Sequence, residues 1–118
     1  MDYNSNYDLF ALSKDIEIDI EDMVDIFNIY FIEVNDLILN LRHLSHNEDW
    51  DKFQKLLHNL KGISINLKLT DIYEMAVNFE NLIKIQNFDL INCHINELQN
   101  LVSRAKLDIN KFFSYNKI

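Results

Sequence analysis

The sequence predicts an all-α protein, an antiparallel four-helix bundle preceded by a short N-terminal helix or extension. Its 118 residues include one glycine, Gly62, and no proline, which argues against a turn-rich β architecture. Apolar residues recur every three or four positions over four segments, which indicates four helices that each bury one face. Short connections between these segments favour antiparallel packing. The predicted extension covers residues 1–18, and the predicted bundle covers residues 19–118.

The first two helices of the predicted bundle are marked by long apolar stripes. The first helix begins near Met23, after acidic residues that suit the positive end of a helix dipole. Its stripe comprises Met23, Phe27, Tyr30, Val34, Leu37, Leu41 and Leu44. The segment from Ser45 to Glu48 has the spacing of a capping box, which predicts that it opens the second helix. The stripe of that helix comprises Trp50, Phe53, Leu57, Leu60, Ser64 and Leu67.

The third and fourth helices follow after short turns. Residues 68–70 are typical of a tight turn, and we expect Thr70 to cap the third helix. Its stripe comprises Ile72, Met75, Ala76, Phe79, Leu82 and Ile83. Asn87 is expected to cap the fourth helix, whose stripe comprises Ile91, Ile95, Leu98, Val102, Ala105, Ile109 and Phe112. Before the bundle, Leu9, Phe10 and Leu12 are expected to form a short helix against one end of it.

Charge is distributed unevenly along the chain, whose formal net charge is −8. An acidic protein is poorly suited to binding nucleic acid. Residues 1–36 hold ten acidic residues and one lysine, and residues 37–118 hold nine acidic and ten basic residues, which gives net charges of −9 and +1. Residues 52–68 contain four lysines and no acidic residue. This stretch is either a solvated helix face or a basic surface suited to an acidic partner.

Cysteine content and hydropathy together predict a cytoplasmic protein. Cys93 is the only cysteine, so no intramolecular disulfide can form, which fits a reducing compartment. The polar, acidic N-terminus does not resemble a signal peptide. No apolar run approaches the ~20 residues that span a bilayer, so we expect no association with a membrane.

The second predicted helix carries a histidine, a lysine and the only glycine close together. Glycine in a helix interior costs roughly 0.5–1 kcal/mol relative to alanine, so Gly62 indicates that a side chain there would be an obstacle. One helical turn places Gly62 beside His58, and Lys61 is also within reach. His58 is about 100° away from Leu57 around the helix and faces solvent. Ile65 is the one large apolar residue on this otherwise polar face. The group suggests a phosphate-carrying histidine that another protein approaches.

Glu80 is expected to lie at the height of His58. Both residues are eleven positions away from Leu69, and in two antiparallel helices this separation corresponds to about 16 Å from the turn. A carboxylate at that height can accept a hydrogen bond from one ring nitrogen and leave the other as the nucleophile. The alternative is that Glu80 is only a solvated surface residue.

These residues resemble the histidine-containing phosphotransfer (HPt) family. The family signature is a histidine followed by x-Leu-Lys-Gly, small residues and then Leu-Gly, on the second long helix of a four-helix bundle. It is matched here by His58, Leu60, Lys61, Gly62, Ser64 and Leu67. The segments 47–50 and 79–82 are also similar to the family pattern, so the resemblance spans roughly residues 20–112. Two positions depart from it: Lys68 replaces a helix-ending glycine, and Ile65 replaces a small residue.

The resemblance implies a phosphocarrier that has no autonomous catalytic activity. A receiver domain phosphorylated on aspartate would dock over His58 and transfer its phosphoryl group to the imidazole. A second receiver would then accept the group from His58. Lys61 would neutralise phosphate charge, Gly62 would admit the receiver backbone, and Lys55 and Ile65 would belong to the docking surface. The bundle would need no cofactor of its own, because the receiver supplies Mg²⁺. The implied partners are response-regulator receiver domains and a hybrid histidine kinase, and the chain is expected to be a monomer.

Two other functions are compatible with parts of the sequence. A metal site could use His43 and His46, or the adjacent Cys93 and His94, but no Glu-x-x-His pair of the kind found in di-iron bundles is present. In the simpler interpretation His43 and His46 are surface or loop residues, His94 is a boundary histidine, and Cys93 packs as a small hydrophobe. The second alternative is an HPt-like bundle that only binds receivers or acts as a scaffold, with Ile65 blocking transfer.

Overall fold

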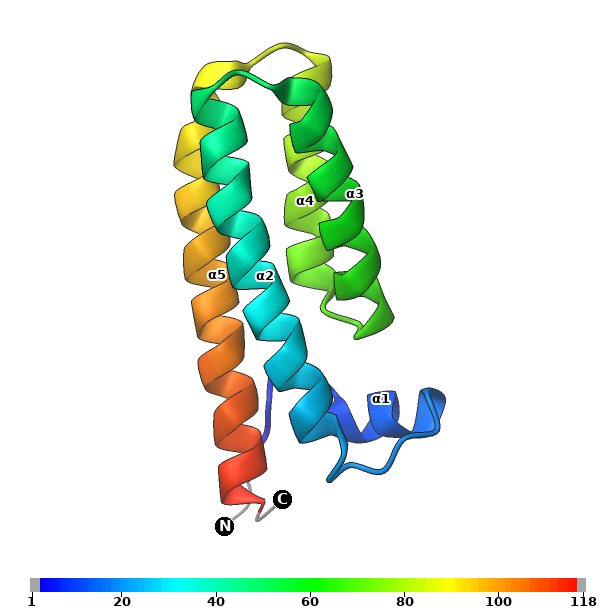
Figure 1. The fold of residues 1–118 in the computed structure, drawn as a ribbon. Coiled ribbons are helices and arrows are strands. Elements are labelled where there is room, and N and C mark those ends of the chain that lie inside the picture. The colour runs from blue at the N-terminus through cyan, green and yellow to red at the C-terminus, as the bar shows by residue number, and fades with distance from the viewer. Residues whose placement is uncertain (1–2, 117–118) are drawn as a thin grey trace.

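Five helices make up the computed structural model over residues 3–116, which are the residues that the structure describes. They are α1 (Leu9–Asp15), α2 (Met23–His46), α3 (Trp50–Asn66), α4 (Thr70–Lys84) and α5 (Phe88–Tyr115). Helices α2 to α5 form the predicted antiparallel bundle, in which α2 contacts α3 and α5, and α4 contacts α3 and α5 (Figure 1). The α3–α4 hairpin is shorter than the α2 and α5 pair, and α1 lies beyond its end (Figure 1). The all-α prediction is confirmed. The predicted boundary after residue 18 falls between α1 and α2, and residues 1–2 and 117–118 of the two predicted ranges lie outside the described residues.

The four predicted apolar stripes form the core of the bundle. Their most deeply buried members include Val34 on α2, Phe53 on α3, Phe79 on α4 and Leu98 on α5, each with 0% exposure. A few members at the margins are only partly buried, namely Leu44, Trp50, Leu67, Met75 and Leu82. Burial of one stripe on each helix fixes its rotation, and therefore determines which residues of α3 face solvent.

Each connection that follows α1, α2, α3 or α4 contains a residue in the left-handed backbone conformation. These residues are Glu17, Glu48, Lys68 and Gln86, each with φ of 57°. After α3, the Lys68 amide donates to the Ile65 carbonyl at 3.0 Å and the Leu69 amide donates to the Ser64 carbonyl at 2.9 Å. This pair of bonds is a Schellman motif, which usually places glycine at the left-handed position. The departure at Lys68 therefore leaves the helix-ending turn intact, at a cost of roughly 1 kcal/mol for a residue with a Cβ.

Two predicted helix caps were placed wrongly. Ser45 lies in the last turn of α2, where it is buried and donates to Asn92 on α5 at 2.7 Å, and Asp49 caps α3 instead. The capping-box spacing at Ser45 was misleading because the preceding helix continues through Ser45 and ends at His46. Thr70 is the first residue of α4 rather than its cap, since Leu69 occupies the cap position without a side-chain bond. Asn87 does occupy the cap position of α5, also without a side-chain bond.

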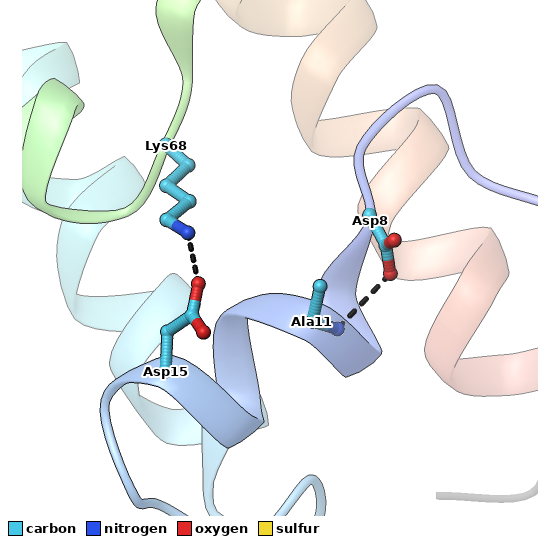
Figure 2. A network of polar contacts seen from close by, with 4 residues as sticks. All are labelled: Asp8, Ala11, Asp15 and Lys68. Carbon is cyan, nitrogen blue, oxygen red and sulfur yellow. Dashed lines mark hydrogen bonds and ion pairs between the residues drawn. The ribbon is translucent and has the colours of Figure 1, made fainter.

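Hydrogen bonds and an ion pair connect the segment before α2 to the bundle. Asp108 on α5 is buried and accepts hydrogen bonds from Tyr3 Oη at 2.6 Å, Ser5 Oγ at 2.6 Å and the Asn6 amide at 3.0 Å. Asp8 caps α1, and Asp15 at the end of α1 pairs with Lys68 (Figure 2). The structure thus contains the expected short helix at the bundle end, with Leu9 and Leu12 buried but Phe10 56% exposed.

Candidate functional site

His58 lies in the middle of α3 on the face turned away from the core. Leu57 and Leu60 on either side of it are completely buried, and this burial directs the imidazole outward. The ring lines an open, shallow depression on α3 together with Asp51, Gln54, Lys55 and Asn59. The residue is exposed, and no hydrogen bond joins its ring to another residue within 3–116. An exposed imidazole of this kind can act as a nucleophile.

Four exposed residues form a stripe along α3, which we call the His58 stripe. It consists of Lys55, His58, Gly62 and Ile65, at spacings of three, four and three residues. Ile65 is 41% exposed. The stripe therefore places a cation, an imidazole, bare backbone and an apolar side chain on one exposed face of α3.

Nothing in the described part of the chain requires residue 62 to be a glycine. It lies inside α3 without a positive φ, and a Cβ added to it would meet no atom of residues 3–116 within 4 Å. Sequence reasoning attributed this glycine to a space that must stay open, and the structure shows that the space is outside the protein. No residue within 3–116 therefore makes a steric demand at this position.

Lys61 and Glu80 form an ion pair between α3 and α4. Lys61 Nζ donates to Glu80 Oε1 at 2.8 Å, and the two side chains are only 24% and 29% exposed. The hydrogen bond to Glu80 raises the pKa of Lys61, against the opposing effect of partial burial. The expected bond between Glu80 and His58 is not found; the carboxylate accepts from Lys61 instead, in a charge-assisted hydrogen bond. The opposite charges of Lys61 and Glu80 on facing helices were the signal that sequence reasoning overlooked.

The other histidines and the cysteine lie away from the His58 stripe. His43 and His46 are found near the end of α2, where His43 is exposed. His94 is partly buried, with Nδ1 2.9 Å from the Leu90 carbonyl, as expected for a boundary residue. Cys93 is exposed, so the expectation that it packs as a small hydrophobe was wrong. Among residues 3–116, no three His, Cys, Asp or Glu side chains are grouped to hold a metal ion.

A helical bundle with an exposed histidine in the middle of its second long helix is typical of histidine phosphotransfer modules. The family model of the Hpt domain matches residues 25–107, which is more than half of the chain and includes the whole His58 stripe, Lys61 and Glu80. The chain therefore belongs to the Hpt domain family. No curated protein and no solved structure matches it. Hpt domains are phosphocarriers that serve histidine phosphotransfer in phosphorelays, with receiver domains and kinases as partners. None of the helices in the described part of the chain is long and apolar enough to cross a bilayer.

Proposed function

We propose that this protein is a histidine phosphocarrier that relays a phosphoryl group between receiver-domain aspartates, with His58 as the phosphoacceptor. The observation that carries the proposal is that an exposed His58, unpartnered among residues 3–116, lies one turn from Gly62, beside which those residues leave open space. The membership of the Hpt domain family supports the same function. The protein would act without autonomous catalysis, as a cytoplasmic monomer.

In the proposed transfer, the lone pair of one His58 ring nitrogen attacks the phosphorus of an aspartyl phosphate. An N–P bond forms while the P–O bond to aspartate breaks, and the electron pair leaves with the carboxylate. The reverse step delivers the group to the aspartate of a second receiver. Phosphoryl transfer depends mainly on positioning and on stabilisation of charge, and the Mg²⁺ for this is expected from the receiver rather than from this chain.

The His58 stripe is proposed as the docking surface for these receivers. Lys55 offers a positive charge to the acidic surroundings of a phosphorylated aspartate, and Gly62 admits backbone close to the imidazole. Ile65 offers an apolar contact two turns further along α3. The receivers are those of a response regulator and of a hybrid histidine kinase.

One observation favours a second candidate function. Ile65 is large and 41% exposed at a position near His58, so it can instead obstruct the receiver. The bundle would then bind receivers, or act as a scaffold, without accepting phosphate.

The two functions are separated by phosphorylation of His58. Receiver domains phosphorylated with acetyl phosphate are incubated with the wild-type protein and with His58→Gln, and acid-labile, base-stable label is measured. We expect label on the wild-type protein and none on the variant, because His58 is the acceptor. His43→Gln, His46→Gln and His94→Gln serve as matched controls and should be labelled like the wild type. Label on His58→Gln at the wild-type level would refute the assignment, and binding without label on the wild type would favour the second candidate.

A further inference from the structure

The ion pair of Lys61 and Glu80 has no evident structural role. Partly exposed ion pairs contribute little to stability, and the two helices are already joined by buried apolar contacts. Phe53 on α3, for example, meets Phe79 on α4 edge to face at 6.0 Å between ring centroids. The pair lies one turn beyond His58, on the α4 side of the His58 stripe. Its position suggests a role in what happens at the imidazole.

A phosphoryl group on His58 would compete with Glu80 for Lys61. Residues three apart on a helix are neighbours, so the lysine side chain can reach a group bound to His58. A phosphoryl group carries a charge of about −1.5 to −2 and three strong acceptor oxygens, compared with the single charge of a carboxylate. The ammonium therefore has a reason to change partner when phosphate arrives.

We infer that Glu80 is a positioning residue that acts on Lys61: it holds the ammonium against α4 beside the free imidazole and yields it to the phosphoryl group on His58. The inference rests on the proposed function. It gives Glu80 a role through the lysine, in place of the predicted orientation of the imidazole. It also means that Glu80 restrains transfer, because the lysine must leave one partner to assist at the other.

The sign of the effect of Glu80→Gln tests the inference. The wild type, Glu80→Gln, Lys61→Gln and the double variant are phosphorylated with potassium phosphoramidate, a small donor that needs no docking surface, and the initial rate of labelling of His58 is measured. We expect Glu80→Gln to react about two- to fivefold faster, as the loss of a partly exposed ion partner would allow. Lys61→Gln should react more slowly, and adding Glu80→Gln to it should change nothing further. Glu74→Gln removes a carboxylate elsewhere on α4 and should behave like the wild type.

A second measurement does not depend on transfer. The titration of the Lys61 ammonium is followed by NMR in the unphosphorylated proteins. Glu80→Gln should lower the pKa of Lys61, because the hydrogen bond to Glu80 raises it.

The outcomes separate this inference from the proposed function. A slower reaction of Glu80→Gln in both the wild-type and the Lys61→Gln background would overturn the inference in favour of imidazole orientation. A faster reaction of Glu80→Gln that persists in the Lys61→Gln background would also overturn it, because the effect would then be a general one of charge. If the wild type took no label on His58 from phosphoramidate or from phosphorylated receivers, the proposed function itself would fall, and no variant would differ from the wild type.

Discussion

Replacing Gly62 with alanine should stabilise the protein while it impairs transfer. The position lies in the interior of α3, it is exposed, and an added Cβ would meet no atom of the described residues within 4 Å. Alanine is favoured over glycine in a helix interior by roughly 0.5–1 kcal/mol, and nothing in the chain opposes this gain. For a chain of this length the entropy of unfolding is about 0.25 kcal/mol per kelvin at the midpoint, so Tm should rise by about 2–4 °C.

The effect on transfer should have the opposite direction. If a receiver places its backbone against Gly62, a methyl group there forces a displacement that costs on the order of 1–3 kcal/mol, as overpacking of a close contact does. This corresponds to a loss of roughly 5- to 150-fold in kcat/KM for transfer from a phosphorylated receiver domain. Single-turnover transfer measures this loss. Phosphoramidate provides the control, because a small donor does not contact Gly62 and should label the variant at the wild-type rate.

Two results would refute this reasoning about Gly62. A lower Tm would show that the chain itself requires glycine, contrary to the open space that an added Cβ would occupy. A higher Tm with unchanged transfer from the receiver would show that no partner approaches this part of α3. Only the combination of gained stability and selective loss of receiver transfer supports docking over His58.

Two further predictions follow from the exposure of Ile65 and the burial of two tyrosines. Ile65→Ala should weaken receiver binding about fivefold in a titration, since apolar anchors at an interface contribute on the order of 1 kcal/mol. The control variant Ile85→Ala, at a site that is 70% exposed, should leave binding unchanged. Faster transfer in Ile65→Ala would instead identify Ile65 as an obstruction. Burial, with a hydrogen bond to Asp71 for Tyr7, raises the pKa of Tyr7 and Tyr30 above the unfolded value near 10. As pH rises, the unfolded chain releases these protons before the folded protein does, so the free energy of unfolding should fall above about pH 10. Urea titrations at several pH values measure this, and a free energy of unfolding that stays constant up to about pH 11 would contradict the prediction.

The bundle could be predicted because burial on one face of a helix leaves a periodic record in the sequence. The stripe from Met23 to Leu41 and that from Ile91 to Phe112 are buried as the spacing required. The outward position of His58 follows from the same periodicity, since it is set by the burial of its neighbour Leu57. Helix ends were less predictable, because the hydroxyl of Ser45 fits a cap by spacing but bonds to Asn92 across the bundle.

Side-chain partners between helices could not be predicted from the positions of residues along the helix axes alone. The equal separation of His58 and Glu80 from Leu69 gave an axial position, but the partner of Glu80 is decided by which donor reaches it and how strongly that donor is charged. Lys61, with a long side chain and a full charge, takes that place. The hydrogen bonds of Asp108 with residues 3–6 could not be predicted either, since they join segments about a hundred residues apart in the sequence.

The placement of glycine in this chain is the strongest argument that the His58 stripe has been shaped by a partner. Four residues with side chains, among them Lys68 and Glu48, occupy left-handed positions where glycine would relieve roughly 1 kcal/mol each. The single glycine instead occupies an ordinary helical position, where it destabilises α3 by a similar amount. Folding stability alone would favour the reverse arrangement. The cost at Gly62 is explained if a second molecule must approach the backbone one turn from His58, as a receiver domain would during phosphotransfer.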